Sequence, residues 1–322
     1  MELVLLDEET LYEYIFERYV ELEANANDLS QDLGILSRNE SELEIDIGPH
    51  RLVTRKKKAP ERDEYTFSIH QNLTSLNSNR DNNNSTTGYV IWTTSTFILK
   101  WLLYNDNATI FTRGGVKDEV DITSIFQCQQ DDKLRYVLEL GTGTSPMFPI
   151  VFSNYVDKYV ATDQKDILPR LKDNIQENQS ECRRRLLKSN TIALDDLKRR
   201  TELECQIDIA LLDWELFSGS KKSRNDPVLQ CGPNFHLTII AMDVIYNEYL
   251  IVPFLTTLES LFVWYTEQRV TVSALIGIQL RTQDVLEMFL EEAIIERQFI
   301  VHAVDEKELN KSRFILLHVN LP

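Results

Sequence analysis

The stretch VLELGTGT at residues 137–144, followed by ATD at 161–163, is the pattern that decides the fold. A short apolar segment runs into a turn with two glycines, and a carboxylate follows after the next apolar segment. Glycine permits a sharp turn and a close approach of the backbone to a ligand, and an acid after the next strand can accept both hydroxyls of a ribose. The pattern is typical of a nucleoside-cofactor pocket.

Two residues distinguish this turn from a dinucleotide-binding fingerprint. Pro146 occupies the place of the third glycine, which such a fingerprint needs for close helix packing. Glu139 lies just before the turn, where a negative charge would repel a pyrophosphate and attract a cationic aminoacyl group. The residues therefore favour S-adenosylmethionine over NAD as the cofactor.

From residue 136 onward, short apolar runs alternate with helical stretches, which is typical of a mostly parallel sheet covered by helices on both faces. The last two runs lie close together after an expected helix at about 282–297, so an antiparallel pair should end the sheet. The prediction is a Rossmann-like α/β fold with seven strands and an antiparallel final strand. The strands are expected at 136–140, 158–162, 207–212, 237–242, 270–279, 299–304 and 314–319.

The first part of the chain, up to residue 87, differs in composition from the rest. An amphipathic helix is expected at 9–24 and a half-buried strand around positions 65–69. The Asn/Ser/Thr-rich stretch at 77–87 cannot build a core and reads as a flexible connection. We therefore divide the chain into an acidic extension (1–76), a linker (77–87) and a cofactor-binding domain (88–322).

Two insertions are expected within the larger domain. One is polar and covers residues 105–133, ahead of the first core strand. The other is helical, covers residues 177–200 and contains arginine-rich clusters at 183–185 and 198–200. A solvated surface is the expected role of the second insertion, and a local binding face is the alternative.

The net charge of −17 is concentrated in residues 1–50, which contain fourteen acidic residues and two arginines. This distribution disfavours direct binding to nucleic acid and suits a basic protein partner, although acidity also aids solubility. The run at 55–58 is either a nuclear address, a phosphate contact or a solvated loop. The scattered histidines and four cysteines predict no metal site and no disulfide framework.

The N-terminus has no basic region followed by a long apolar stretch, and no later run is expected to reach membrane-spanning length. We therefore expect a soluble cytoplasmic protein without a membrane partner, with the nucleus as the alternative through the run at 55–58.

Candidate ligand groups follow four successive predicted strands, at the carboxyl ends where ligands bind in open α/β sheets. Gly141 and Gly143 follow the first strand, and Asp163 follows the second. Trp214, whose indole can pack against adenine, follows the third strand, and the segment 243–246 follows the fourth. Each residue alone has a structural explanation, such as a helix cap or a core side chain, but their order favours one shared site.

These residues resemble the motif set of the seven-β-strand protein-lysine methyltransferases, methyltransferase family 16, over residues 88–322. The acidic extension and the segment 71–73 resemble a fungal branch whose members methylate ribosomal proteins. The matching motifs are Gly88-x-x-x-Trp92, Glu139-x-Gly141-x-Gly143, Thr162-Asp163, Leu212-x-Trp214 and Asp243-Val244-x-Tyr246.

The resemblance implies an S-adenosylmethionine-dependent enzyme that methylates a lysine of a basic ribosomal protein of the large subunit, adding one or more methyl groups. It implies that Asp243 and Tyr246 border the lysine channel as catalytic residues. The family usually has glycine where this chain has Glu215, which puts the adenine contact in doubt. The residues implied to bind the cofactor are Trp92, Glu139, Gly141, Thr142, Gly143, Asp163, Trp214 and Met242.

The reaction requires a neutral lysine, because an ammonium group has no lone pair. Burial beside a cationic sulfur lowers the pKa of that lysine, and Asp243 is expected to align the amine. Two alternatives stay open: an RNA or small-molecule methyltransferase, and a cofactor-binding assembly module without catalysis.

Overall fold

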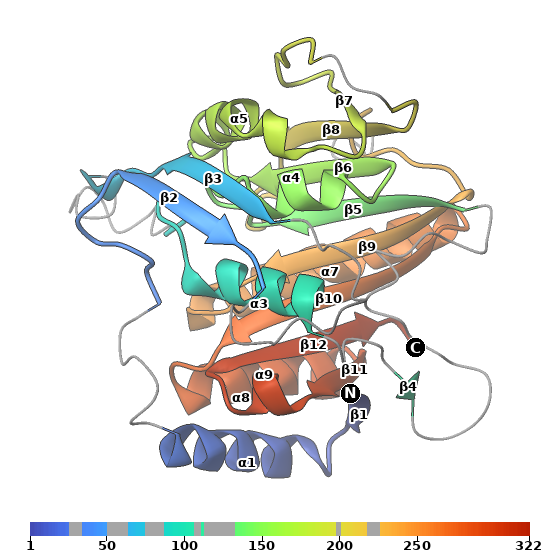
Figure 1. Ribbon diagram of the computed structural model, residues 1–322. Helices are drawn as coiled ribbons and strands as arrows, with labels where there is room; N and C mark the ends of the chain where they lie inside the picture. Colours follow the sequence, from blue (N-terminus) through green and yellow to red (C-terminus); the bar gives the residue numbers. More distant parts are fainter. Residues whose placement is uncertain are drawn as a thin grey trace, which may run out of the picture.

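The computed structural model describes residues 1–25, 34–49, 64–74, 87–105, 111–112, 133–197, 201–217 and 226–322. Four features expected from the sequence lie wholly or mostly outside these ranges, namely the basic run at 55–58, the connection at 77–87, the polar insertion at 105–133 and the arginine-rich cluster at 198–200. The described residues form one large sheet covered by helices, with a two-stranded hairpin packed on it (Figure 1).

The large sheet contains ten described strands in the order β4-β1-β11-β12-β10-β9-β5-β6-β8-β7. Neighbouring strands from β10 to β7 are parallel, whereas β12 runs antiparallel to both β10 and β11. The strands are β1 (Glu2–Leu6), β4 (Phe111–Thr112), β5 (Leu134–Leu140), β6 (Lys158–Asp163), β7 (Leu186–Lys188), β8 (Glu204–Leu211), β9 (Phe235–Met242), β10 (Thr271–Gln279), β11 (Ile300–Asp305) and β12 (Phe314–Asn320).

The predicted fold class is confirmed, because all seven expected strands are present as β5, β6, β8, β9, β10, β11 and β12. The antiparallel pair near the end of the chain is confirmed as well. The prediction missed β1, β4 and β7, which extend the two edges of the sheet. β4 and β7 have only two and three residues, too few for an alternating pattern, and the apolar run of β1 does not alternate.

Helices cover both faces of the sheet. One core cluster joins α1 (Leu11–Ala24), α7 (Glu248–Glu267) and α8 (Gln283–Glu291) to one face. The other cluster joins α3 (Thr93–Tyr104), α4 (Met147–Ser153), α5 (Leu168–Glu177) and the hairpin of β2 (Glu42–Ile47) and β3 (Tyr65–His70) to the opposite face. A π-helical turn (Glu292–Glu296) extends α8, and the short α9 (Lys307–Asn310) precedes β12.

The N-terminal segment is part of the sheet. β1 pairs with β11, and Leu11 and Ile15 of α1 are buried in the core below it. Arg18 is also buried, and its guanidinium donates hydrogen bonds to the backbone oxygens of Leu309 and Ser312 at 3.2 Å. The amphipathic helix expected at 9–24 is thus confirmed, and it is joined to the end of the chain through an otherwise costly buried cation.

The β2–β3 hairpin is fixed by Asn174 of α5 and by Asn178, the residue that follows this helix. Asn178 exchanges hydrogen bonds of 2.7 and 2.9 Å with the backbone of Ser68, and Asn174 exchanges bonds of 2.9 and 3.0 Å with the backbone of His70. Asn174 also donates to the backbone oxygen of Thr144, at 2.7 Å, in the glycine-rich turn. The hairpin therefore supports the turn after β5, although it comes from the predicted extension.

A second connection runs through Gln71. Its side chain donates to the backbone oxygens of Ser37 and Glu40 at 2.9 and 2.6 Å, and it accepts from the backbone N–H of Ile91 at 3.1 Å. Three segments distant in sequence meet at this one buried amide. The domain division at 77–87 stays a prediction, and these contacts cross it.

The prediction of a helical insertion at 177–200 is wrong. The helix α5 ends at Glu177, and a short 3₁₀ turn (Gln179–Glu181) and β7 follow it. The buried carboxylate of Asp208 accepts hydrogen bonds from the backbone of Asn190 and Thr191 at 2.8 and 3.1 Å. These bonds satisfy backbone donors that a helix would use, so a turn forms instead.

Contrary to our expectation, one helix, α7, is long and apolar enough to span a membrane by length and composition. Half of its apolar window is buried inside the protein. Side chains such as Phe254, Leu258 and Phe262 belong to the core cluster under the sheet. The apolar composition of α7 fits a core helix.

Candidate active site

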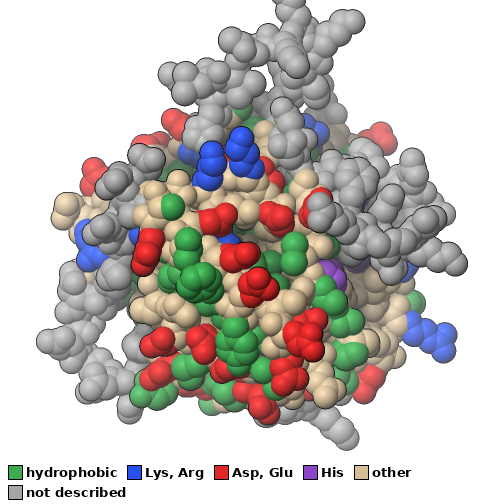
Figure 2. Space-filling view, turned by 90° about the horizontal axis from the view of Figure 1, so that it is seen from below, with side chains coloured by type: hydrophobic (Ala, Val, Ile, Leu, Met, Phe, Trp, Pro, Cys, Tyr) green, Lys and Arg blue, Asp and Glu red, His purple; other side chains and the backbone are tan. Residues whose placement is uncertain are grey.

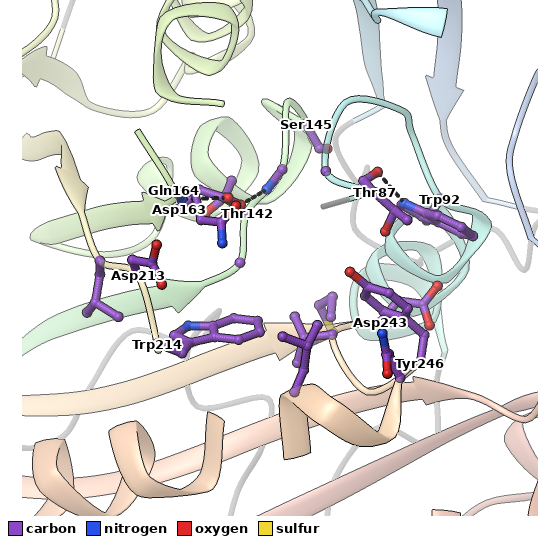
Figure 3. Close-up of a pocket in the computed structure, with 18 of the residues that line it drawn as sticks. Thr87, Trp92, Thr142, Ser145, Asp163, Gln164, Asp213, Trp214, Asp243 and Tyr246 are labelled. Atoms are coloured by element: carbon purple, nitrogen blue, oxygen red, sulfur yellow. Dashed lines mark hydrogen bonds between the residues drawn. The ribbon is translucent and has the colours of Figure 1, made fainter. Parts of the chain in front are cut away.

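A cavity of about 550 Å³ opens at the carboxyl ends of β5, β6, β8 and β9. Its volume is within the range of small-molecule sites, and its position is the usual one in open α/β sheets. Figure 3 shows Asp163, Asp213 and Trp214 on one side of it, and Trp92, Asp243 and Tyr246 on the other. All but one of the predicted site residues line the cavity: Trp92, Gly141, Thr142, Gly143, Asp163, Trp214, Met242, Asp243 and Tyr246.

The turn after β5 leaves no room for a side chain at either of its two glycines. Gly141 has φ +69°, and a Cβ atom there would lie 2.8 Å from Cγ1 of Val244 and 2.9 Å from the indole of Trp214. Gly143 has φ +64°, and a Cβ atom there would lie 3.1 Å from the backbone oxygen of Gly88. Both positions require the left-handed conformation that glycine adopts without strain.

Asp163 lies at the end of β6 and faces the glycine turn. Its carboxylate accepts hydrogen bonds of 2.7 Å from the backbone N–H groups of Gly143 and Gln164. Burial raises the pKa of Asp163 to about 6, and these two hydrogen bonds oppose the rise. Each carboxylate oxygen retains a lone pair, so the group can still accept bonds from ligand hydroxyls.

Trp214 forms the wall after β8. Its ring packs edge-on against Phe254 with centroids 5.2 Å apart, and its buried Nε1 has no hydrogen-bond partner among the described residues. Glu215, which replaces the glycine usual in the family, also lines the cavity. Glu215 is not among the described residues with positive φ, so the departure introduces no backbone strain here.

Glu139 is the predicted cofactor residue that does not line the cavity. Its carboxyl group accepts a 2.6 Å hydrogen bond from Tyr159, on the neighbouring strand β6. Burial raises the pKa of Glu139 to about 8, so the group is mostly neutral at pH 7. The attraction of a charged Glu139 for a cationic aminoacyl group therefore finds no support in this geometry.

Asp243 is held by an arginine that the sequence analysis missed. Both of its carboxylate oxygens accept 2.6 Å hydrogen bonds from Arg281, which follows β10. The Asp243 side chain is 1% exposed, and its backbone has φ +61°, a conformation that Asp tolerates better than most residues. Burial raises the pKa of Asp243, and Arg281 opposes the rise.

Two aromatic rings stand beside this ion pair. The guanidinium of Arg281 lies 5.0 Å from the centre of the Trp92 ring, and Trp92 stacks with Tyr246 at a centroid distance of 6.5 Å. Burial raises the pKa of Tyr246, so its hydroxyl is protonated at neutral pH. Met242 completes this end, and it packs so closely on Gly277 that a Cβ atom there would lie 2.6 Å from its sulfur.

The sequence analysis also missed several lining residues, among them Gln164, Asp213 and Tyr249. The first two are direct neighbours of Asp163 and Trp214, so proximity to predicted residues could have indicated them. Arg281 had no such signal, because it lies far from its partner in the sequence and outside every motif.

The donor and acceptor set fits a nucleoside cofactor with an aminoacyl chain. The glycine turn provides a cradle that any Cβ atom would fill, Asp163 provides carboxylate acceptors, and Trp214 provides a ring wall with a buried N–H. The opposite end, with Trp92 and Tyr246, can hold an apolar chain that ends in a polar group.

Comparison with known proteins agrees with this geometry. The chain is 40% identical to ribosomal lysine N-methyltransferase 5 of Lachancea thermotolerans, with 98% of each chain covered. It is 39% identical to the protein of the same name from Saccharomyces cerevisiae, with 96% of this chain and 97% of that one covered.

A solved structure, the methyltransferase domain of bacterial CtHen1, matches 59% of this chain and 90% of its own at 12% identity and a TM-score of 0.34. A family model described as lysine methyltransferase matches residues 70–293. The chain therefore belongs to the lysine methyltransferase family.

Proposed function

We propose that this protein transfers a methyl group from S-adenosylmethionine to a lysine of a ribosomal protein. The observation that carries the proposal is a cavity with two different ends. The glycine turn and the Asp163 carboxylate lie at one end, and aromatic rings lie at the other beside Asp243, which is paired with Arg281. The names of the relatives from Lachancea and Saccharomyces support a ribosomal substrate.

Residues at the glycine end would hold the cofactor. Gly141 and Gly143 admit its aminoacyl part, Asp163 accepts its ribose hydroxyls, and Trp214 packs on its adenine. When bound, S-adenosylmethionine supplies a methyl group on a positively charged sulfur.

Residues at the other end would prepare the lysine. An unperturbed lysine has a pKa of about 10.4, so only a minute fraction is neutral at pH 7. Trp92 and Tyr246 stack on each other at this end of the cavity, and a lysine amine placed beside their rings would lose hydration, which lowers its pKa. The lysine then attacks with its lone pair, and positioning and desolvation supply most of the rate.

An acidic and apolar face supports a basic protein partner. Tyr12, Phe16 and Val20 lie one turn apart along α1 and are 45%, 66% and 48% exposed. Acidic side chains of α1 and α8 surround them, including Glu13 and Glu17. Figure 2 shows this face, on which acidic and hydrophobic side chains dominate. Such a surface is complementary to a lysine-rich segment that also contributes apolar side chains.

The direct test incubates the purified protein with methyl-labelled S-adenosylmethionine and intact ribosomes of a Saccharomyces cerevisiae strain that lacks its own protein of the same name, so that the target lysine is unmodified, and then separates protein from RNA. We expect label on a lysine of one ribosomal protein, and peptide masses would give the number of methyl groups. Asp243→Asn should lower the rate, whereas Gly48→Ala, at a glycine outside the site, should not. Label in RNA, or no label despite cofactor binding, would contradict the proposal.

The acidic face has a separate test. The double substitution Glu13→Lys and Glu17→Lys should raise KM for the protein substrate several-fold, because it replaces attraction with repulsion. A matched double reversal on the far side of the molecule, Asp173→Lys with Glu177→Lys on α5, should leave KM unchanged. An equal effect of both variants would show that net charge matters and the α1 face does not.

A further inference from the structure

We propose that Arg281 is a positioning residue that keeps Asp243 paired, so that the substrate lysine enters the channel as a neutral amine and not as an ammonium ion. This inference rests on the proposed function, because it concerns how the same cavity receives lysine. Arg281 does not line the cavity itself, and it acts through Asp243 and Trp92, which do.

The geometry of the pair leaves little freedom to Asp243. Two parallel hydrogen bonds of 2.6 Å engage both of its oxygens in the bidentate arrangement that suits a guanidinium, and Arg281 donates a third bond of 3.0 Å to Gln279. Gly34 packs against the Gln279 amide, where a Cβ atom would lie 1.9 Å from Oε1. Three partners thus hold Arg281: Gln279 at the end of β10, the Asp243 carboxylate and the Trp92 ring.

The charge of the pair decides which form of lysine is favoured. A free buried carboxylate beside the channel would pair with an ammonium group and raise its pKa, which works against attack. With Arg281 in place, the carboxylate is already neutralised, and a second cation entering next to the guanidinium meets repulsion. The neutral amine suffers no such penalty and can still contact an Asp243 oxygen as a hydrogen-bond donor.

The other titratable groups around Asp243 do not replace Arg281. Tyr246 on the same loop is held neutral by burial, and Asp163, across the cavity, is an acid that would attract an ammonium group. Within the part of the chain that the structure describes, Arg281 is the cation whose charge acts on Asp243. Loss of the Arg281 charge would therefore leave the Asp243 carboxylate free to attract the ammonium form of the lysine.

The transfer itself stays balanced in atoms and charge. The nitrogen lone pair forms the new N–CH₃ bond while the S–CH₃ bond breaks and its electrons remain on sulfur. The methylated nitrogen carries the positive charge and loses a proton to solvent before a further round. Arg281 takes no part in these bonds.

The test compares wild type, Arg281→Gln, Arg281→Lys and the double variant Asp243→Asn with Arg281→Gln. Initial rates with methyl-labelled S-adenosylmethionine and a subsaturating extract of total ribosomal protein give relative kcat/KM between pH 6 and 10. We expect the rising limb of Arg281→Gln to move to higher pH by about one unit, a roughly tenfold loss at pH 7. Arg281→Lys should recover part of it, and the double variant should return towards the wild-type pH dependence.

A second measurement separates this inference from the proposed function. Binding of n-butylamine, a lysine side-chain analogue, is titrated at pH 7 and pH 10 by NMR, with and without S-adenosylhomocysteine. Wild type should bind it more tightly at pH 10, and Arg281→Gln should bind it more tightly at pH 7 than wild type does. Thermal unfolding and cofactor affinity report whether each variant is folded.

A purely structural role for Arg281 predicts a different result. Its variants would then lose activity equally at every pH, and Arg281→Gln would bind butylamine no more tightly than wild type does at pH 7. Either finding in a folded variant overturns the inference. If no ribosomal protein is labelled by the wild type, the proposed function fails, while the butylamine titration still decides the role of Arg281.

Discussion

The two ends of the cavity are built in different ways. At the cofactor end, Gly141, Gly143 and Asp163 come from one short stretch of the chain, and the backbone N–H of Gly143 donates directly to the Asp163 carboxylate. At the lysine end, Trp92, Asp243 and Arg281 come from widely separated parts of the sequence and meet only through their side chains. The first end depends on local chain geometry, and the second depends on the completed fold.

This difference determines how each end should respond to change. A backbone cradle is sensitive to any added side-chain atom but tolerates alterations elsewhere. Side chains that come from distant segments are instead displaced by any change that moves one of those segments. Four predictions test the contrast, from the largest expected effect to the smallest.

Deletion of residues 1–76 should cause the largest loss. It removes β1 from between β4 and β11, Leu11 and Ile15 from the core, and Gln71 from the backbone of Ile91. We expect mostly insoluble protein or a fall in Tm of more than about 10 °C, since several kcal/mol of burial is lost. A soluble truncated chain with full cofactor affinity would instead support the domain division at 77–87.

Gly141→Ala should weaken cofactor binding roughly 10- to 100-fold. The new Cβ atom must displace Val244 or Trp214, and the left-handed backbone adds about 1–3 kcal/mol of strain. Calorimetric titration with S-adenosylhomocysteine measures the effect. Gly48→Ala is the matched control, because a Cβ atom there makes only ordinary contacts with Glu64. Equal affinities of the two variants would refute the cradle.

Cofactor affinity should fall as the pH decreases through about 6. Burial raises the pKa of Asp163 from 3.8 to about 6, and a protonated carboxyl is a poorer acceptor for ribose hydroxyls. From pH 7 to pH 5 we expect an approximately tenfold loss of cofactor affinity. At pH 5, one unit below the pKa of Asp163, only about a tenth of its carboxyl groups are ionised. Asp163→Asn should bind the cofactor weakly at every pH. If this variant instead keeps the pH dependence of the wild type, another group is responsible for that dependence.

Glu139→Gln should change cofactor affinity least and alter the pH dependence of stability. The pKa of Glu139 is raised from 4.5 to about 8, so its contribution to stability is complete below pH 4.5 and is lost as the pH rises to about 8. The glutamine variant lacks this loss, and its Tm relative to wild type should therefore increase between pH 5 and pH 8. A constant difference in Tm would indicate that Glu139 is already ionised when folded.

The parts of the fold that are specified locally could be predicted from the sequence. Apolar runs indicated all seven expected strands, and the order of Gly141, Asp163 and Trp214 indicated the cofactor end of the cavity. The strand β1, which lies between β4 and β11, was missed because a short apolar run at 2–6 does not indicate a partner at 300–305. Arg281 was missed for a similar reason: its significance lies in a contact, and a single arginine after a strand is ordinarily a solvated residue.

The pairing of β1 with β11 has a consequence during synthesis of the chain. Glu2 lies opposite Asp305, so β1 is made long before the strand β11 with which it pairs. At synthesis rates of about 5–20 residues per second, the intervening chain takes roughly 15 to 60 s to make. For that time the side of β1 that pairs with β11, and the apolar face of α1, lack their native partners, which makes this newly made segment a natural client for chaperones.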